Sequence, residues 1–231
     1  MEEKRMRWID SHCHLDFDEF LDPKLLMDQL AQAGCDRILL PAISRRYFDR
    51  AIKFRQQFPS MTDLALGLHP YFIDAHRDDD LAALDQTLNS NEFVAVGEIG
   101  LDFVLDQSSW DKLIQFFEDQ VKLAKFHNLP LVIHCRKAHD QLHSILKRLN
   151  FNNGGFVHGF SGSYQQATRY LDQGLLLGMG GALTHERAKA MHRLVSQLPN
   201  DGYVLETDSP DMRPSFETSA INTPLNIPRI A

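Results

Sequence analysis

Histidines placed one residue apart near the N-terminus are the first sign of chemistry in this chain. They lie in Asp10-Ser11-His12-Cys13-His14. In an extended segment alternate side chains share a face, so His12 and His14 point to one place and Cys13 points away. Two imidazoles in this arrangement suit one divalent cation. Ordinary polar histidines at the end of a strand are the alternative for this pair alone.

A carboxylate interrupts an apolar run at Glu98, in Gly97-Glu98-Ile99-Gly100-Leu101-Asp102. An ionised carboxylate among Val, Ala and Ile residues is costly to bury without a cation. A metal ion would supply that cation. A buried ion pair between Glu98 and an arginine is the alternative.

Two further histidines each close an apolar run: His134 ends Leu131-Val132-Ile133-His134, and His158 ends Gly155-Phe156-Val157-His158. A single histidine in such a position is more often a core residue than a ligand. Two of them on consecutive strands, at the same depth, favour metal ligation.

The last candidate is Asp208, in Leu205-Glu206-Thr207-Asp208-Ser209-Pro210, after the final apolar run. In a closed barrel the eighth strand lies beside the first, so we expect Asp208 next to His12 and His14. An ordinary turn is the alternative, because Asp and Pro are turn residues.

Together these residues predict two divalent cations that share Glu98 as a bridging ligand. The predicted partition is His12, His14 and Asp208 at one site, and His134 and His158 at the other. Two cations about 3.5–4 Å apart hold the attacking and leaving oxygens of a displacement reaction and lower the pKa of bound water. Asp208 is also predicted as the general base that takes the proton of this water. The donor set leaves Zn²⁺, Mn²⁺, Ni²⁺ and Mg²⁺ open, and Cys13 and Cys135 are predicted to pack in the core.

Eight short apolar runs position these residues. They are Arg7–Asp10, Cys35–Ile43, Thr62–Leu68, Phe93–Ile99, Leu129–Cys135, Gly155–Phe160, Leu175–Met179 and Tyr203–Thr207. Near-continuous apolar runs indicate strands buried on both faces, as in a parallel sheet. Helical patterns separate them at Asp22–Ala33, Ser108–Phe126, His139–Leu149, Ser163–Leu171 and Glu186–Leu198.

This alternation predicts an α/β fold, a single (β/α)₈ TIM barrel, with residues 1–231 forming one hydrolase domain. An open doubly wound sheet is the alternative. The candidate residues fall at the C-terminal ends of the predicted strands, where barrel enzymes carry their active sites. We expect the final helix to have only started before Ala231, so that most of it is lacking.

Composition excludes several classes of protein. With 231 residues and 43% hydrophobic residues the chain can form a large core, and its net charge of −7 argues against coating nucleic acid through bulk positive charge. An enzyme that takes up a phosphodiester through bound cations is still allowed. The three cysteines cannot all pair, and no apolar signal-peptide core is present, so we expect thiols in the cytoplasm. Apolar runs such as Gly174–Leu183 are too short and glycine-rich to span a membrane.

Six motifs in order resemble the TatD-type metal-dependent hydrolases of the amidohydrolase-like barrel superfamily, over nearly the whole chain. They are Asp10–Asp16, Gly67–Pro70, Gly97–Asp102, His134–Arg136, His158–Gly162 and Glu206–Pro210. The resemblance implies that the six ligand candidates above are the metal ligands of this family. It also implies a divalent-metal-dependent deoxyribonuclease that hydrolyses phosphodiester bonds, and a final helix beyond the position of Ala231.

Substrate contacts are predicted at two polar residues on the same rim. His69 can reach a substrate phosphate or serve as a turn residue, and Arg136 can bind a phosphate through its planar fork or pair with Asp102. Aromatic residues on rim loops, Phe103, Tyr71 and Phe72, can stack a base or cover the barrel. The basic cluster of Arg45, Arg46, Arg50 and Lys53 is expected to be a solvated helix face.

The predicted substrate is DNA or a small phosphodiester, with no membrane and no obligate protein partner. One alternative is a metal-dependent hydrolase of a small cyclic amide or ester, although no lysine occurs near Glu98 to bridge the metals. The other alternative is a non-catalytic barrel that binds metal or nucleotide. That alternative requires Asp208 to be dispensable.

Overall fold

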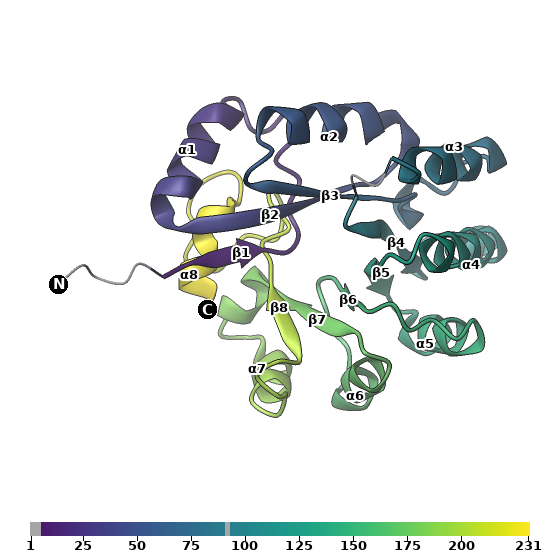
Figure 1. Ribbon diagram of the computed structural model, residues 1–231. Coiled ribbons are helices and arrows are strands. Elements are labelled where there is room, and N and C mark those ends of the chain that lie inside the picture. Colours follow the sequence, from purple (N-terminus) through teal and green to yellow (C-terminus); the bar gives the residue numbers. More distant parts are fainter. Residues whose placement is uncertain (1–5, 91–92) are drawn as a thin grey trace.

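The computed structural model describes residues 6–90 and 93–231. Within these residues one parallel sheet contains the strands in chain order. The strands are β1 (Trp8–Asp10), β2 (Cys35–Ala42), β3 (Thr62–Leu66), β4 (Ala95–Asp102), β5 (Leu131–Arg136), β6 (Gly155–Val157), β7 (Leu176–Met179) and β8 (Tyr203–Leu205). Figure 1 shows them running round a common centre with the helices outside.

Backbone hydrogen bonds join the end of β8 to the end of β1. The N–H of Ser11 donates to the carbonyl of Leu205 at 3.0 Å, and the N–H of Asp208 donates to the carbonyl of His12 at 2.8 Å. A parallel bridge pairs Cys13 with Ser209. The sheet therefore closes, which confirms the predicted (β/α)₈ barrel over the open doubly wound sheet.

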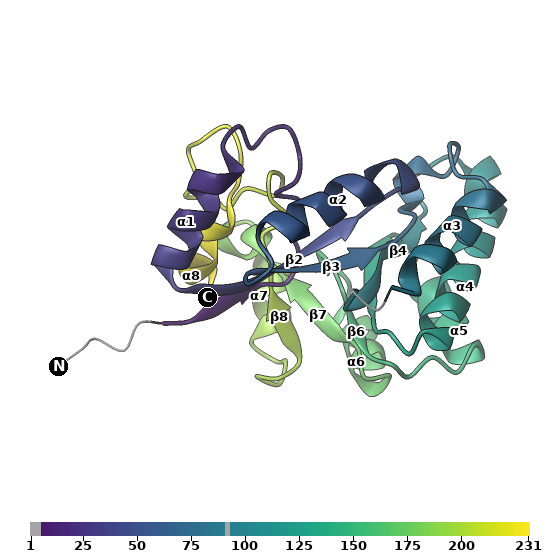
Figure 2. The same ribbon diagram turned by 45° about the horizontal axis from the view of Figure 1, so that its top comes forward.

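Helices form the outer layer of this barrel (Figures 1 and 2). They are α1 (Pro23–Ala33), α2 (Arg45–Gln57), α3 (Asp78–Leu88), α4 (Trp110–Phe126), α5 (His139–Arg148), α6 (Tyr164–Asp172), α7 (Lys189–Val195) and α8 (Ile227–Ile230). Local signals mark their ends: the carboxylate of Asp22 accepts the N–H of Leu25 at the start of α1, and Gly34 ends that helix with a φ of 95°.

Two helices differ from the sequence prediction. The α3 helix was not predicted, although Asp78, Asp79 and Asp80 in its first turn suit the positive end of a helix dipole. The α7 helix is shorter than the predicted Glu186–Leu198. The short α8 helix lies beside α1 in both views and buries Ile227.

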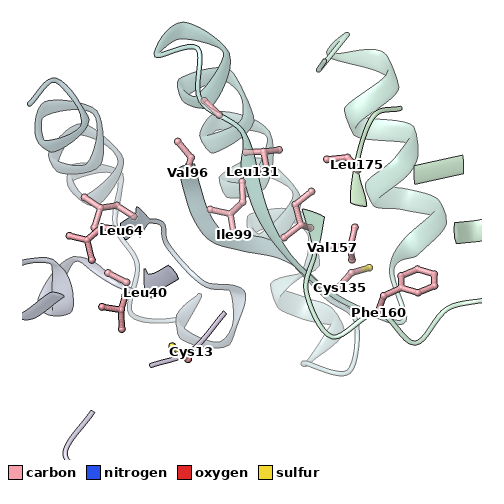
Figure 3. Close-up of a cluster of buried hydrophobic side chains, with 14 of the residues drawn as sticks. Cys13, Leu40, Leu64, Val96, Ile99, Leu131, Cys135, Val157, Phe160 and Leu175 are labelled. Carbon is pink, nitrogen blue, oxygen red and sulfur yellow. The ribbon is translucent and has the colours of Figure 1, made fainter. Parts of the chain in front are cut away.

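Apolar side chains from successive strands form the core (Figure 3). They include Leu40 of β2, Leu64 of β3, Ile99 of β4 and Leu131 of β5. Cys13 and Cys135 belong to this cluster, which confirms their predicted packing role, and Cys35 is a buried thiol as well. Burial raises the pKa of both Cys35 and Cys135 to about 12. No helix in the described ranges has the length and hydropathy to cross a membrane.

Several strand boundaries differ from the prediction in ways that position the site. Strand β4 continues to Asp102, so Glu98 lies inside the strand and not at its end. The pairing register of β4 with β5 shifts between Val96 and Ile99. Such an irregularity re-aims the side chains next to it, and Glu98 is one of them. A Cβ at Gly100 would collide with the backbone carbonyl of His134, so glycine allows β4 and β5 to approach there.

Candidate metal centre

The six predicted metal ligands come from five strands and meet at one end of the barrel. His12 and His14 follow β1, Glu98 lies in β4, His134 lies in β5, His158 follows β6 and Asp208 follows β8. All of them except the fully buried His12 line one cavity of about 620 Å³. The cavity also includes His69 and Arg136, the two predicted substrate contacts.

His12, His14 and Asp208 form a first cluster of donor atoms. The Nε2 atoms of His12 and His14 lie 3.3 Å apart, and each lies 3.5 Å from Oδ1 of Asp208. Ligands at about 2.1 Å from a tetrahedral cation lie about 3.4 Å from one another. The spacing of these atoms therefore fits one cation, as expected from the alternation of His12 and His14 and from barrel closure.

Glu98 joins this cluster to a second one. Its Oε2 lies 3.2 Å from Nε2 of His12, and its Oε1 lies 3.2 Å from Nδ1 of His134 and 3.1 Å from Nε2 of His69. One nitrogen or carboxylate oxygen from each of His69, Glu98 and His134 lies within 4.8 Å of the others. The two oxygens of one carboxylate thus face different clusters, which is the arrangement of a bridging ligand.

His69 is held by the backbone that follows it. The N–H of Tyr71 donates to Nδ1 of His69 at 3.0 Å, so in the neutral ring Nε2 carries the proton. That N–H then donates to Oε1 of Glu98. His69 therefore contacts the predicted bridging carboxylate from inside the cavity, and its contact with substrate stays a prediction.

His158 lies on the side of the first cluster. Its ring stacks on His12 with centroids 3.8 Å apart, and its Nε2 lies 3.6 Å from Oδ2 of Asp208. Its Nδ1 lies 3.0 Å from Oε1 of Glu206. The structure thus groups His158 with His12 and Glu206. The predicted sharing of a cation with His134 stays a prediction.

Charge at the centre keeps the carboxylates ionised. Burial alone raises the pKa of Glu98, but His69 and His12 hold it well below its ordinary value. Burial has the same effect at Asp208, where His158 and His14 hold the pKa low. Burial and the neighbouring His158 lower the pKa of His12. Against the effect of burial, the carboxylates of Asp208, Asp102 and Glu206 raise the pKa values of His14, His134 and His158. A cation that binds these rings would therefore displace protons from them, because imidazole binds metal in its neutral form.

Sequence reasoning missed the role of Glu206. This residue is 1% exposed and accepts the N–H of Gly159 at 2.6 Å beside its contact with His158. Its Oε2 has no hydrogen-bond partner in the described chain and lies against Gly178, where a Cβ would collide with it. A carboxylate in the apolar run Tyr203–Thr207 is the same kind of sequence signal as Glu98.

Asp102 orients the ring of His134, on the side of the ring that faces away from Glu98. Its Oδ2 lies 3.2 Å from Nε2 of His134, which leaves Nδ1 of that ring facing Glu98. A carboxylate behind a metal-binding histidine fixes the orientation of the ring and raises its basicity. Arg136 lies 3.6 Å from the same oxygen, and its side chain is 60% exposed at the cavity. Phe103 stacks on Trp110, and both rings pack against the hydrophobic core.

Comparison with known proteins also indicates a metal-dependent hydrolase. A family model described as TatD related DNase matches residues 9–231. An uncharacterized metal-dependent hydrolase from Haemophilus influenzae is 42% identical over 216 residues, covering 90% of this chain and 82% of the relative. A protein named 3'-5' ssDNA/RNA exonuclease TatD, from Cronobacter turicensis, is 33% identical over 204 residues, covering 86% and 77%. The crystal structure of YjjV, a TatD homologue from Escherichia coli K12, superposes with a TM-score of 0.92 at 38% identity, covering 97% and 87%.

Proposed function

This chain belongs to the TatD related DNase family of metal-dependent hydrolases, and we propose that it hydrolyses phosphodiester bonds of single-stranded DNA with two divalent cations. Residues 1–231 act as one barrel domain in this proposal. The choice of DNA is supported by relatives named 3'-5' ssDNA/RNA exonucleases. More similar relatives are described only as metal-dependent hydrolases.

The observation that supports two cations is the position of Glu98 between two clusters of donor atoms. One oxygen faces His12 and the other faces His134, each at 3.2 Å. Neither cluster has an arginine or lysine partner among the described salt bridges that would explain the burial of this carboxylate. The donors therefore fit divalent cations, which supply positive charge for activating water and stabilising the phosphate when bound.

In this proposal the carboxylate of Asp208 acts as the general base. It faces the open cavity, and it is ionised because the neighbouring histidines hold its pKa low. A positioned base of this kind contributes about 10²–10⁴ to a rate. His158 lies between this carboxylate and that of Glu206, 3.6 Å from Oδ2 of Asp208 and 3.0 Å from Oε1 of Glu206.

The remaining cavity residues bind substrate in this proposal. The guanidinium of Arg136 reaches the cavity from β5 and offers a planar fork to a phosphate oxygen. The N–H of His69 holds Glu98 at the side of the cavity. The cavity of about 620 Å³ is large enough for a nucleotide.

Hydrolysis assays with and without chelator test this function. We expect the protein to cleave bis(p-nitrophenyl) phosphate and a labelled single-stranded oligonucleotide, to lose both activities in EDTA, and to regain them with Mg²⁺, Mn²⁺, Zn²⁺ or Ni²⁺. Faster turnover of a cyclic amide or lactone than of any phosphodiester would contradict the proposal. Tight metal binding without turnover of any ester would support the non-catalytic alternative.

A further inference from the structure

The cavity extends beyond the metal centre in two directions with different chemistry. The wall near β7 and β8 contains Met179, Met191 and Met212 together with the carboxylate of Asp211. Another part of the lining is aromatic and contains Phe17, Tyr71 and Phe72. A substrate in the cavity therefore meets apolar and negatively charged side chains in one part and aromatic rings in another.

The aromatic wall leads outward from the first ligand cluster. The ring of Phe17 stacks on that of His14, with centroids 4.7 Å apart. Farther out, Phe72 and Tyr71 meet edge to face at 5.1 Å in the short 3₁₀ helix η1 (Pro70–Phe72). Tyr71 is 68% exposed, so its ring does not serve to fill the core. The wall ends in an aromatic face that is open to solvent.

A cation lies over the same wall. The guanidinium of Arg46, in the first turn of α2, lies 4.6 Å from the ring centre of Tyr47 and 4.9 Å from that of Phe72. Its neighbour Arg45 pairs with Asp80 at 3.4 Å. Within residues 6–90 and 93–231 no carboxylate oxygen lies within 4.0 Å of Arg46. Arg46 is thus held in place by ring faces, with its charge free for a ligand.

We propose that Arg46, Tyr71 and Phe72 form a subsite for the nucleotide next to the scissile phosphate in a single strand. This proposal rests on the proposed function. The base stacks on the exposed ring of Tyr71, and the flanking phosphate pairs with Arg46. A duplex keeps its base faces covered, so only an unpaired strand can make both contacts.

Charge on the two walls sets the path of the strand. Asp211 lies beside Asp208 on the methionine wall, where a second phosphate would meet repulsion. Arg46 provides attraction on the aromatic wall. The chain of phosphates therefore leaves the centre over Phe72 and towards α2.

Binding measurements test the subsite independently of turnover. The probe is a fluorescein-labelled hexathymidylate with phosphorothioate linkages, which keeps the charges and bases and resists hydrolysis, and the metal-loaded protein is titrated by anisotropy. We expect Tyr71→Ala to weaken binding about 5- to 100-fold, the usual range for one stacked base. Arg46→Gln should weaken binding and reduce the salt slope by about one phosphate contact. The matched control is Arg45→Gln, which removes a paired guanidinium from the same helix turn.

An abasic strand of the same length separates stacking from a structural effect. The difference between wild type and Tyr71→Ala should disappear with this strand, because no base remains to stack. A Tyr71→Ala loss that persists with the abasic strand would overturn the stacking assignment. Equal binding of hexathymidylate by wild type, Tyr71→Ala and Arg46→Gln would overturn the subsite.

The hydrolysis assay and the binding assay together show which of the two proposals fails. If wild type cleaves phosphodiesters but Tyr71→Ala and Arg46→Gln bind the hexathymidylate normally, the subsite is wrong and the proposed function stands. If no phosphodiester is cleaved and both variants still lose binding relative to Arg45→Gln, the subsite stands and the proposed function is wrong.

Discussion

Replacement of Glu98 by glutamine tests the shared carboxylate, because the amide keeps the shape of the side chain but has one oxygen. Oε1 of Glu98 faces His69 and His134, whereas Oε2 faces His12. In either orientation of the amide, one cluster meets an –NH₂ group, which cannot ligate a cation. Both clusters also lose the negative charge that they share.

The size of the effect follows from the two contacts. A hydrogen bond to a charged group contributes about 1.5–3 kcal/mol. With this value as the scale for one carboxylate contact in each cluster, the loss of both costs about 3–6 kcal/mol. Because each 1.4 kcal/mol is tenfold in an equilibrium constant, the combined affinity for two cations should fall by about 10²–10⁴. Turnover of bis(p-nitrophenyl) phosphate should fall with it.

The assay is metal binding in competition with a chromogenic chelator, together with melting curves with and without EDTA. Glu118→Gln is the control, since it removes the same charge from α4, where the carboxylate pairs with Arg148. Chelation should lower the melting temperature of wild type and Glu118→Gln, because metal that binds only the folded state stabilises it. Glu98→Gln should melt at nearly the same temperature in both conditions. Full occupancy of both sites in Glu98→Gln, or loss of one site with the other at wild-type affinity, would refute a bridging role.

Three other predictions use the same protein. Asp208→Asn should lower kcat on a phosphodiester by about 10²–10⁴-fold at saturating metal, with a smaller loss of metal than in Glu98→Gln. Near-wild-type turnover would make Asp208 a turn residue. Arg136→Lys should raise KM for an oligonucleotide, because an ammonium does not reproduce the planar fork, and unchanged kinetics would leave Arg136 a structural role. Because burial raises the pKa of Cys35 and Cys135 to about 12, about one thiol in 10⁴ is ionised at pH 8. Iodoacetamide should therefore label them only after unfolding, as counted by mass spectrometry, and rapid labelling of the folded protein would contradict their burial.

The barrel was predictable because its signals are local. Each of the eight strands lies within or overlaps an apolar run of the sequence, and proline, glycine and capping carboxylates mark helix ends such as those of α1. Strand ends were less predictable. Strand β6 ends at Val157 and β8 at Leu205, earlier than predicted, because the residue pairing with the neighbouring strand ends there.

Residue types and spacing alone placed His12 and His14 on one face, because side-chain alternation is a property of the extended backbone. The burial of Glu98 was predictable from the sequence for a similar reason, because the residues on either side of this carboxylate are apolar. These features depend on residues a few positions apart.

Contacts between distant segments required the tertiary structure. His158 stacks on His12, and Glu206 lies behind His158, because closure of the barrel places the ends of β1, β6 and β8 around one opening. Arg46 lacks a carboxylate within 4.0 Å in the described chain while Arg45 has one, which depends on where α2 meets α3 and η1. Sequence identifies which side chains can bind metal, whereas the distances that divide them into clusters arise from packing among segments that are far apart in the chain.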